Sequence, residues 1–209
     1  MTWTRHRWDQ TIQLYERDEA LAPHGITDQV ESWLTRLHDP ASRVISDLGG
    51  GLSHAFAGLQ SRFAEWIVVD PSARKIAELR NLPELTGCQL RRRDLRDLVP
   101  YHNQLDAILA VGSIGGRQLA DLDRMLLEMC RCLREGGLAI GSYPASPKPT
   151  IATAYLLDQG ETPTPDSMHE VELQYRLQRA GLRAVTMRRI EDGEECEWLV
   201  FRAVRRADN

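Results

Sequence analysis

The sequence predicts an α/β protein: a three-layer sandwich with helices on both faces of a seven-stranded, mostly parallel sheet whose last strand is reversed. Two observations support this fold class. From residue 43 onward, short apolar runs alternate with segments of helical period, which is typical of parallel strands joined by crossover helices. The last two apolar runs are joined only by residues 191–195, too short for a crossover helix, so these strands should pair antiparallel.

Each strand is expected where apolar residues cluster, and each helix where they recur every three to four positions. We expect an N-terminal helical lid over residues 1–40 and one globular domain over residues 41–209. The expected strands are residues 43–48, 65–70, 87–92, 105–111, 137–143, 183–190 and 196–204. The expected helices are residues 53–62, 72–81, 118–133 and 166–180, and the proline-rich residues 143–165 are expected to form a long loop.

The first strand runs into a glycine-rich turn, Gly49-Gly50-Gly51. Glycine accepts positive φ there and lets a ligand approach the backbone closely. The second strand ends at Asp70, about 20 residues beyond the glycines, where nucleoside-binding folds place a carboxylate for the ribose hydroxyls. Asp47, just before the glycines, favours a ligand that carries an amino group and disfavours an NAD oxidoreductase. An alternative role for Asp47 is to orient the glycine turn.

This turn resembles the first motif of the class I S-adenosylmethionine-dependent methyltransferases, Asp-x-Gly-x-Gly, matched here by Asp47, Gly49 and Gly51. Ser53 replaces a third glycine that is common in that motif. The resemblance continues in order to about residue 143. It includes residues 93–95, similar to the adenine-contacting segment, and residues 133–140, similar to the turn into the fifth strand, with Glu135 in place of the usual proline.

The resemblance implies S-adenosylmethionine as cofactor and assigns residues to it. Asp47 would hold the ammonium group, directly or through water, and Gly49, Gly50 and Gly51 would let the methionine part lie against the backbone. Asp70, with Pro71 beside it, would bind the ribose. Asp94 would accept from the adenine amino group and Leu95 would lie near the ring, although Asp94 could instead cap a helix. The fourth strand would line the cofactor with Ala110, Val111 and Gly112.

Three residues are candidates on the substrate side. Tyr143 ends the fifth strand, His54 lies at a helix start and Tyr15 belongs to the N-terminal region. Packing or surface roles explain each of them as well. The four cysteines are expected to be free thiols and the histidines lack the spacing of a zinc site, so no metal is implied. Arg91, Arg92 and Arg93 are expected to protect a sheet edge from aggregation.

The expected reaction is methyl transfer to a small-molecule acceptor with release of S-adenosylhomocysteine. Two alternatives stay open: a cyclase or lyase that releases methylthioadenosine, and an inactive cofactor-binding regulator. A net charge of −4 disfavours nucleic acid as a partner, and residues 110–114 lack the Asn/Asp-Pro-Pro-Tyr/Phe motif of base-methylating enzymes. No apolar run is long enough for a membrane span, which favours a cytoplasmic protein. The sequence leaves open whether the chain forms a homodimer.

Overall fold

The computed structural model describes residues 24–50, 53–115, 118–145, 167–192 and 196–206. Seven strands form one sheet in the order β3-β2-β1-β4-β5-β7-β6. β1 pairs parallel with β2 and β4, and β7 runs antiparallel to β5 and β6, so the predicted fold class is confirmed. The strands are β1 (Val44–Leu48), β2 (Glu65–Asp70), β3 (Gln89–Arg92), β4 (Leu105–Ala110), β5 (Leu133–Pro144), β6 (Leu182–Asp192) and β7 (Cys196–Arg205).

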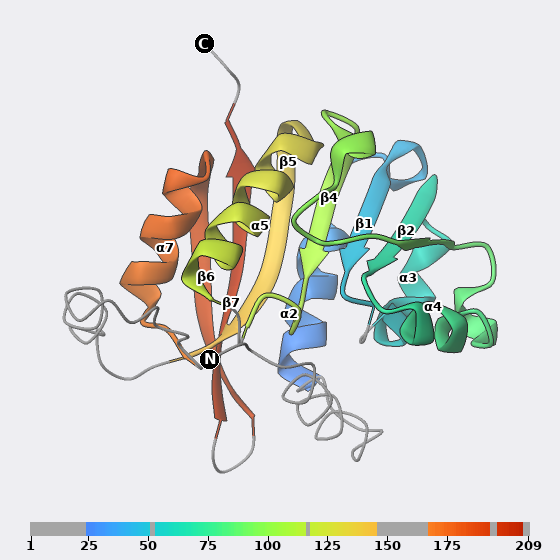
Figure 1. The fold of residues 1–209 in the computed structure, drawn as a ribbon, viewed down its shortest axis with the longest axis horizontal. Coiled ribbons are helices and arrows are strands. Elements are labelled where there is room, and N and C mark those ends of the chain that lie inside the picture. Colours follow the sequence, from blue (N-terminus) through green and yellow to red (C-terminus); the bar gives the residue numbers. More distant parts are fainter. Residues whose placement is uncertain (1–23, 51–52, 116–117, 146–166, 193–195, 207–209) are drawn as a thin grey trace.

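Helices cover both faces of the sheet (Figure 1). On one face lie α2 (His24–Leu34), the 3-10 helix η2 (Ser53–Phe56), α3 (Ala57–Gln60) and α4 (Ala73–Leu79). On the other face lie α5 (Leu119–Cys132) and α7 (Glu170–Arg179). Three further 3-10 helices, η1 (Pro40–Ser42), η3 (Pro83–Leu85) and η4 (Val99–Tyr101), lie in connections between these elements.

Two apolar cores result from the alternation of side chains along the central strands. On β4, Ile108 and Ala110 pack with α5 and α7, whereas Ala107 and Leu109 pack with α2, α3 and α4. All six residues of β4 are buried, as expected for a parallel strand covered on both faces.

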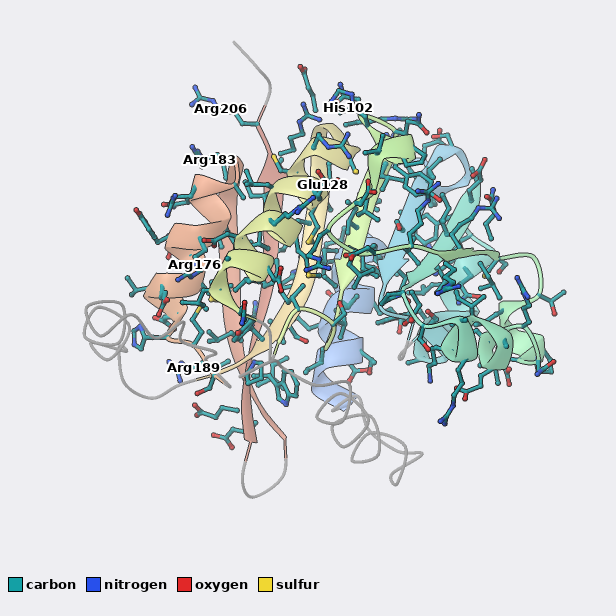
Figure 2. The ribbon with its side chains drawn as sticks, viewed as in Figure 1. His102, Glu128, Arg176, Arg183, Arg189 and Arg206 are labelled. Atoms are coloured by element: carbon teal, nitrogen blue, oxygen red, sulfur yellow. The ribbon has the colours of Figure 1, made fainter. Side chains whose placement is uncertain are left out.

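Ion pairs tie the α5 and α7 layer together (Figure 2). Arg176 on α7 donates to Asp123 on α5 at 2.7 Å and to Glu172 on its own helix at 2.9 Å. Glu128 on α5 accepts the backbone N–H of Leu98 at 3.0 Å, and this bond ties the β3–β4 connection to the helix. The pKa of Glu128 is lowered, mainly because Arg131 donates to its carboxylate.

The structure shifts several of the expected elements. The helix expected over residues 53–62 is divided into η2 and the four-residue α3; Gly58, which has a low helix propensity, lies within this stretch. β3 begins at Gln89, so Cys88 precedes it, and β5 begins at Leu133 because the chain enters the sheet through a register shift opposite β4. Most of the expected proline-rich loop lies outside the described residues, as do residues 1–23 of the expected lid. The α2 helix buries Ile26, Val30 and Trp33 in the core of the sheet.

Candidate functional site

The carboxyl ends of β1, β2 and β4 meet where the strand order reverses, between β1 and β4. In open α/β sheets this switch point is the usual place for a ligand. Hydrogen bonds hold the loops there: the N–H of Gly49 donates to the carbonyl of Val69 at 2.7 Å, and the N–H of Gly112 donates to Ser142 Oγ at 2.9 Å. The loops that follow β1 and β4 are therefore fixed against the neighbouring strands β2 and β5.

The glycines after β1 are required by both conformation and space. Gly49 has a φ of 94° and Gly50 a φ of 54°, in the left-handed region that favours glycine. A Cβ on Gly49 would lie 2.5 Å from Ser113 Cβ, and one on Gly50 would lie 2.8 Å from Leu79 Cδ1. The missing side chain of Gly49 thus makes room for the loop after β4, a packing role that the sequence did not reveal. Gly51 lies outside the described residues.

Asp47, on β1, is a buried carboxylate with 3% of its surface exposed. Ser53 Oγ donates to its Oδ2 at 2.5 Å. No lysine, arginine or histidine in the described part of the chain forms an ion pair with it. Burial raises the pKa of Asp47 to about 6; the Ser53 hydrogen bond lowers this pKa, and the nearby charge of Asp70 raises it. The site therefore carries a negative charge that a cationic group would neutralise.

Asp70, the last residue of β2, is 6% exposed. Its Oδ1 accepts the backbone N–H of Ser72 at 2.7 Å, which fixes the carboxylate at the β2–α4 turn. Ser72 in turn caps α4 by accepting the N–H of Lys75. The Oδ2 atom of Asp70 would lie 3.7 Å from a Cβ on Gly50, so the carboxylate lies beside the glycine turn. Pro71, which follows, is exposed.

Asp94 lies two residues beyond β3 and is held by Arg96. The Arg96 guanidinium donates to both oxygens of Asp94, at 2.9 and 2.6 Å, and also to Asp121 in the first turn of α5 at 2.8 Å. No helix of the described residues begins at Asp94; its carboxylate instead accepts the N–H of Arg96 in a turn. The helix-cap alternative is therefore wrong. Leu95, beside it, is buried at 2% exposure.

The remaining candidates are placed as follows. Ala110 and Val111 are buried at the end of β4, and Gly112 has a φ of 67°. Tyr143 is fully buried among the residues of the α5 and α7 core, so its packing role is observed directly and its role toward a substrate stays a prediction. His54 lies in η2, and its side chain is not among the described ones. Tyr15 lies outside the described residues.

Sequence reasoning missed two polar partners of the site, Arg96 and Ser142. Arg96 holds Asp94, and Ser142 fixes Gly112 from the neighbouring strand. Ser53, which replaces the third glycine of the family motif, donates to Asp47, and the sequence did not reveal this contact. An arginine two residues after an aspartate, or a single serine, is too common in sequences to be recognised as part of a site. Only the fold shows which backbone or carboxylate they reach.

A family described as a methyltransferase domain matches residues 45–137, the stretch that runs from β1 to the start of β5. Residues 45–137 are thus similar to a methyltransferase domain, and the order and direction of the strands are those of the class I methyltransferase fold. No protein of curated function matches the sequence.

Solved structures share the methyltransferase fold at low identity. One is the Burkholderia thailandensis 1,6-didemethyltoxoflavin-N1-methyltransferase with bound S-adenosylhomocysteine, at 16% identity and a TM-score of 0.71, over 99% of this chain and 92% of that one. Another is a complex between the Haloferax volcanii Trm112 methyltransferase activator and a protein designated a methyltransferase, at 16% identity and a TM-score of 0.69. This match covers 96% of this chain and 98% of that one. A third is the [4+2]-cyclase SpnF, at 13% identity and a TM-score of 0.67. This match covers 88% of this chain and 81% of that one.

The methyltransferase domain and the Burkholderia structure indicate S-adenosylmethionine as the cofactor. The residues at the switch point fit this group. Asp47 is a buried carboxylate that lacks a cationic partner among the described residues, and the cofactor carries an ammonium group. Asp70 is a fixed carboxylate at the end of β2, the position that suits ribose hydroxyls.

Proposed function

We propose that this methyltransferase domain transfers the methyl group of S-adenosylmethionine to a small-molecule acceptor and releases S-adenosylhomocysteine. Asp47 is the observation that supports the proposal most strongly. Its carboxylate is buried next to the glycine turn, and burial makes its charge costly. A ligand ammonium group would remove that cost, since an opposite charge nearby stabilises the charged form of a carboxylate.

The other site residues act by binding and orientation. Asp70 accepts hydrogen bonds from the ribose hydroxyls, Asp94 accepts from the adenine amino group, and Leu95 packs near the ring. Gly49, Gly50 and Gly51 let the methionine part approach the backbone, and the end of β4 lines the cofactor with Ala110, Val111 and Gly112. When bound, the cofactor supplies a methyl group on a positively charged sulfur, ready for in-line displacement.

Alignment by such contacts can supply on the order of 7–11 kcal/mol of a barrier, so the chain needs no dedicated base for many acceptors. If the acceptor is a hydroxyl, a side chain within hydrogen-bond reach would take its proton. Tyr143, His54 and Tyr15 are the residues proposed for the substrate side. The residues after β4, Ala110 to Ile114, argue against nucleobase amines as acceptors because they lack the Asn/Asp-Pro-Pro-Tyr/Phe motif. The methylated toxoflavin precursor of the Burkholderia neighbour supports a small molecule.

Titration calorimetry with S-adenosylmethionine, S-adenosylhomocysteine and NAD tests the cofactor directly. We expect the first two to bind and NAD not to bind. We expect Asp70→Ala to weaken S-adenosylhomocysteine binding by about tenfold or more, because each charge-assisted hydrogen bond contributes roughly 1.5–3 kcal/mol. An affinity equal to that of the original chain would remove Asp70 from the ribose site. If neither sulfur nucleoside binds, the proposed function fails.

A non-methylating reaction is the second candidate, because SpnF shows that this fold also hosts a cyclase. Mass spectrometry of the products during an acceptor screen separates the candidates. Methyl transfer gives S-adenosylhomocysteine, whereas cyclisation or cleavage of the cofactor gives methylthioadenosine. A [4+2] cyclisation like that of SpnF gives neither of them and instead converts the substrate into an isomer of the same mass, which chromatography separates. Binding without turnover of any acceptor would instead favour a regulator, or an enzyme that needs a partner. The molar mass in solution, with and without cofactor, would show whether the chain forms a homodimer.

A further inference from the structure

A groove of about 570 Å³ lies near the amino ends of the central strands, away from the carboxyl edge that holds the candidate cofactor site. Apolar side chains from β1, β2 and β4 contribute to its lining: Val44, Ile67 and Leu105, joined by Tyr101 of η4. Ile67 belongs to the core on the α5 and α7 side, so the groove opens on that face of the sheet.

The groove exists because no described helix covers this part of the face. In Figure 1, α5 and α7 lie over the side of the sheet that contains β5, β6 and β7. The connection from β3 to β4 contains only the 3-10 helix η4, and the bond from Leu98 to Glu128 holds it against α5. On the opposite face, α4 packs against β2 and β3.

The lining of the groove is rich in arginine. Arg91 and Arg93 are two residues apart, and both line the groove, as does Arg134 at the start of β5. Arg92, between them, turns the other way and donates to the carbonyl of Pro71 at 3.4 Å. Glu65 is the one carboxylate residue of the lining. Arg134 also pairs with the buried Asp106 at 3.2 Å, so the excess positive charge of the lining lies at Arg91 and Arg93.

Arg91 of β3, and Arg93 just beyond this strand, lie at an open sheet edge. β3 ends the strand order, and no strand of the described residues pairs with its outer side. The outward N–H and C=O groups of such an edge can hydrogen-bond an added extended chain. Protection against aggregation explains exposed arginines such as Arg91 and Arg92, but it does not require Arg91 and Arg93 to line the same groove.

We propose that the β3 edge and this groove bind an extended, acidic segment of a partner protein. The segment adds a strand to β3, and its carboxylate side chains on the groove side pair with Arg91 and Arg93. Guanidinium groups hold carboxylates through two parallel hydrogen bonds. A peptide fits better than nucleic acid because only a peptide offers backbone groups that continue a sheet.

The test uses the full chain and a short blocked peptide of alternating Glu and Val, fluorescently labelled, with binding followed by anisotropy. We expect saturable binding that weakens about tenfold or more in Arg91→Glu, since charge-assisted hydrogen bonds are lost and repulsion is added. Arg92→Glu is the matched control, because it makes the same charge change on the same strand but on the opposite face. Its affinity for the peptide should equal that of the original chain.

Several results would overturn the proposal. The first is a lack of saturable binding of the Glu and Val peptide. The second is an equal loss of peptide affinity in Arg91→Glu and Arg92→Glu. The third is a peptide with Lys in place of Glu that binds as tightly as the Glu peptide. Equal binding of a peptide N-methylated at alternate amides would exclude strand addition. Tighter, Arg91-dependent binding of a single-stranded RNA would make the groove a nucleic-acid site, and displacement of the peptide by tripolyphosphate alone would make it an anion site. S-adenosylhomocysteine affinity, measured in each variant, keeps this test separate from the proposed function.

Discussion

Two buried aspartates on neighbouring strands are held in opposite ways. Asp106, at 6% exposure, pairs with Arg43 at 2.9 Å and Arg134 at 3.2 Å and accepts the N–H of Val44. Asp47, at 3% exposure, accepts a hydrogen bond from Ser53 and pairs with no cation of the described residues. A charge buried without a partner is costly, whereas a paired one is largely compensated. Asp106 therefore holds the fold together, and Asp47 weakens it unless a ligand is bound.

The ionisation of Asp47 should lower the free energy of unfolding as the pH rises. The pKa of Asp47 rises from 3.8 to about 6 on folding, so the folded protein retains a proton that the unfolded chain releases between these values. Stability from this group is complete below pH 3.8 and is lost as the pH rises through 6. We expect Asp47→Asn to raise the free energy of unfolding at pH 7 by up to about 3 kcal/mol, and by little at pH 4.

Urea unfolding of the ligand-free chain at both pH values checks this. Asp106→Asn serves as the matched control, because it removes a buried acid that is paired. It should destabilise the chain at pH 7, since two arginines lose their partner. If Asp47→Asn were also destabilising at pH 7, a cation or other partner of Asp47 would have to exist.

Cofactor affinity should depend on the same carboxylate. Only the charged form of Asp47 attracts an ammonium group, and its pKa of about 6 means that acid depletes this form. We expect the dissociation constant of S-adenosylhomocysteine to rise about tenfold between pH 7 and pH 5, in proportion to the lost ionised fraction. Calorimetry in two buffers of different ionisation enthalpy should detect proton release near pH 6. An affinity that stays constant to pH 5 would argue against contact between Asp47 and the ammonium group.

At the scale of elements, the glycine turn separates two costs of replacing a glycine, which are backbone strain and loss of packing space. Gly49 and Gly87 both have a φ of 94°, but a Cβ on Gly49 would meet Ser113 at 2.5 Å whereas one on Gly87 meets nothing within 4 Å. Gly87→Ala should cost about 1–2 kcal/mol from backbone strain alone. Gly49→Ala should cost several kcal/mol more, roughly the cost of overpacking a core, and should displace the loop after β4. Denaturant midpoints of the two variants measure the difference; equal midpoints would mean that Ser113 moves away freely.

The elements that the sequence predicted well are those with a strong local pattern. The seven strands follow from apolar runs, and Asp70 follows from its place at the end of one of them. Helix 53–62 was predicted too long because periodicity does not register the break near Gly58. The ion pair of Arg96 with Asp121 joins residues 25 positions apart, and the groove beside β3 depends on a connection that forms no covering helix among the described residues. Such features depend on which distant segments the fold brings together, and the local pattern of apolar residues does not contain this information.

Across the whole molecule, binding and stability are placed at opposite ends of the sheet. The candidate cofactor site lies at the carboxyl ends of β1, β2 and β4. Arg205 ends β7 beside the amino ends of β5 and β6, where Leu138 pairs with Val204 and Leu182 with Arg205. It is only 8% exposed, and its guanidinium donates to the carbonyls of Leu133 and Arg131 and to Asn103 Oδ1. The Arg205 side chain therefore ties the end of β7 to the end of α5.

This separation predicts that stability can be reduced without loss of cofactor affinity. Arg205→Gln removes donors from buried carbonyls and should lower the free energy of unfolding by about 2–3 kcal/mol. The dissociation constant of S-adenosylhomocysteine should not change at temperatures where the variant is folded, because Arg205 bonds Asn103, Arg131 and Leu133, which lie away from the carboxyl edge of the sheet. Arg206→Gln, an exposed neighbour in Figure 2, should change neither quantity. If Arg205→Gln weakened binding in step with stability, the two ends of the sheet would be coupled, and the β5–β7 pairing that connects them would carry that coupling.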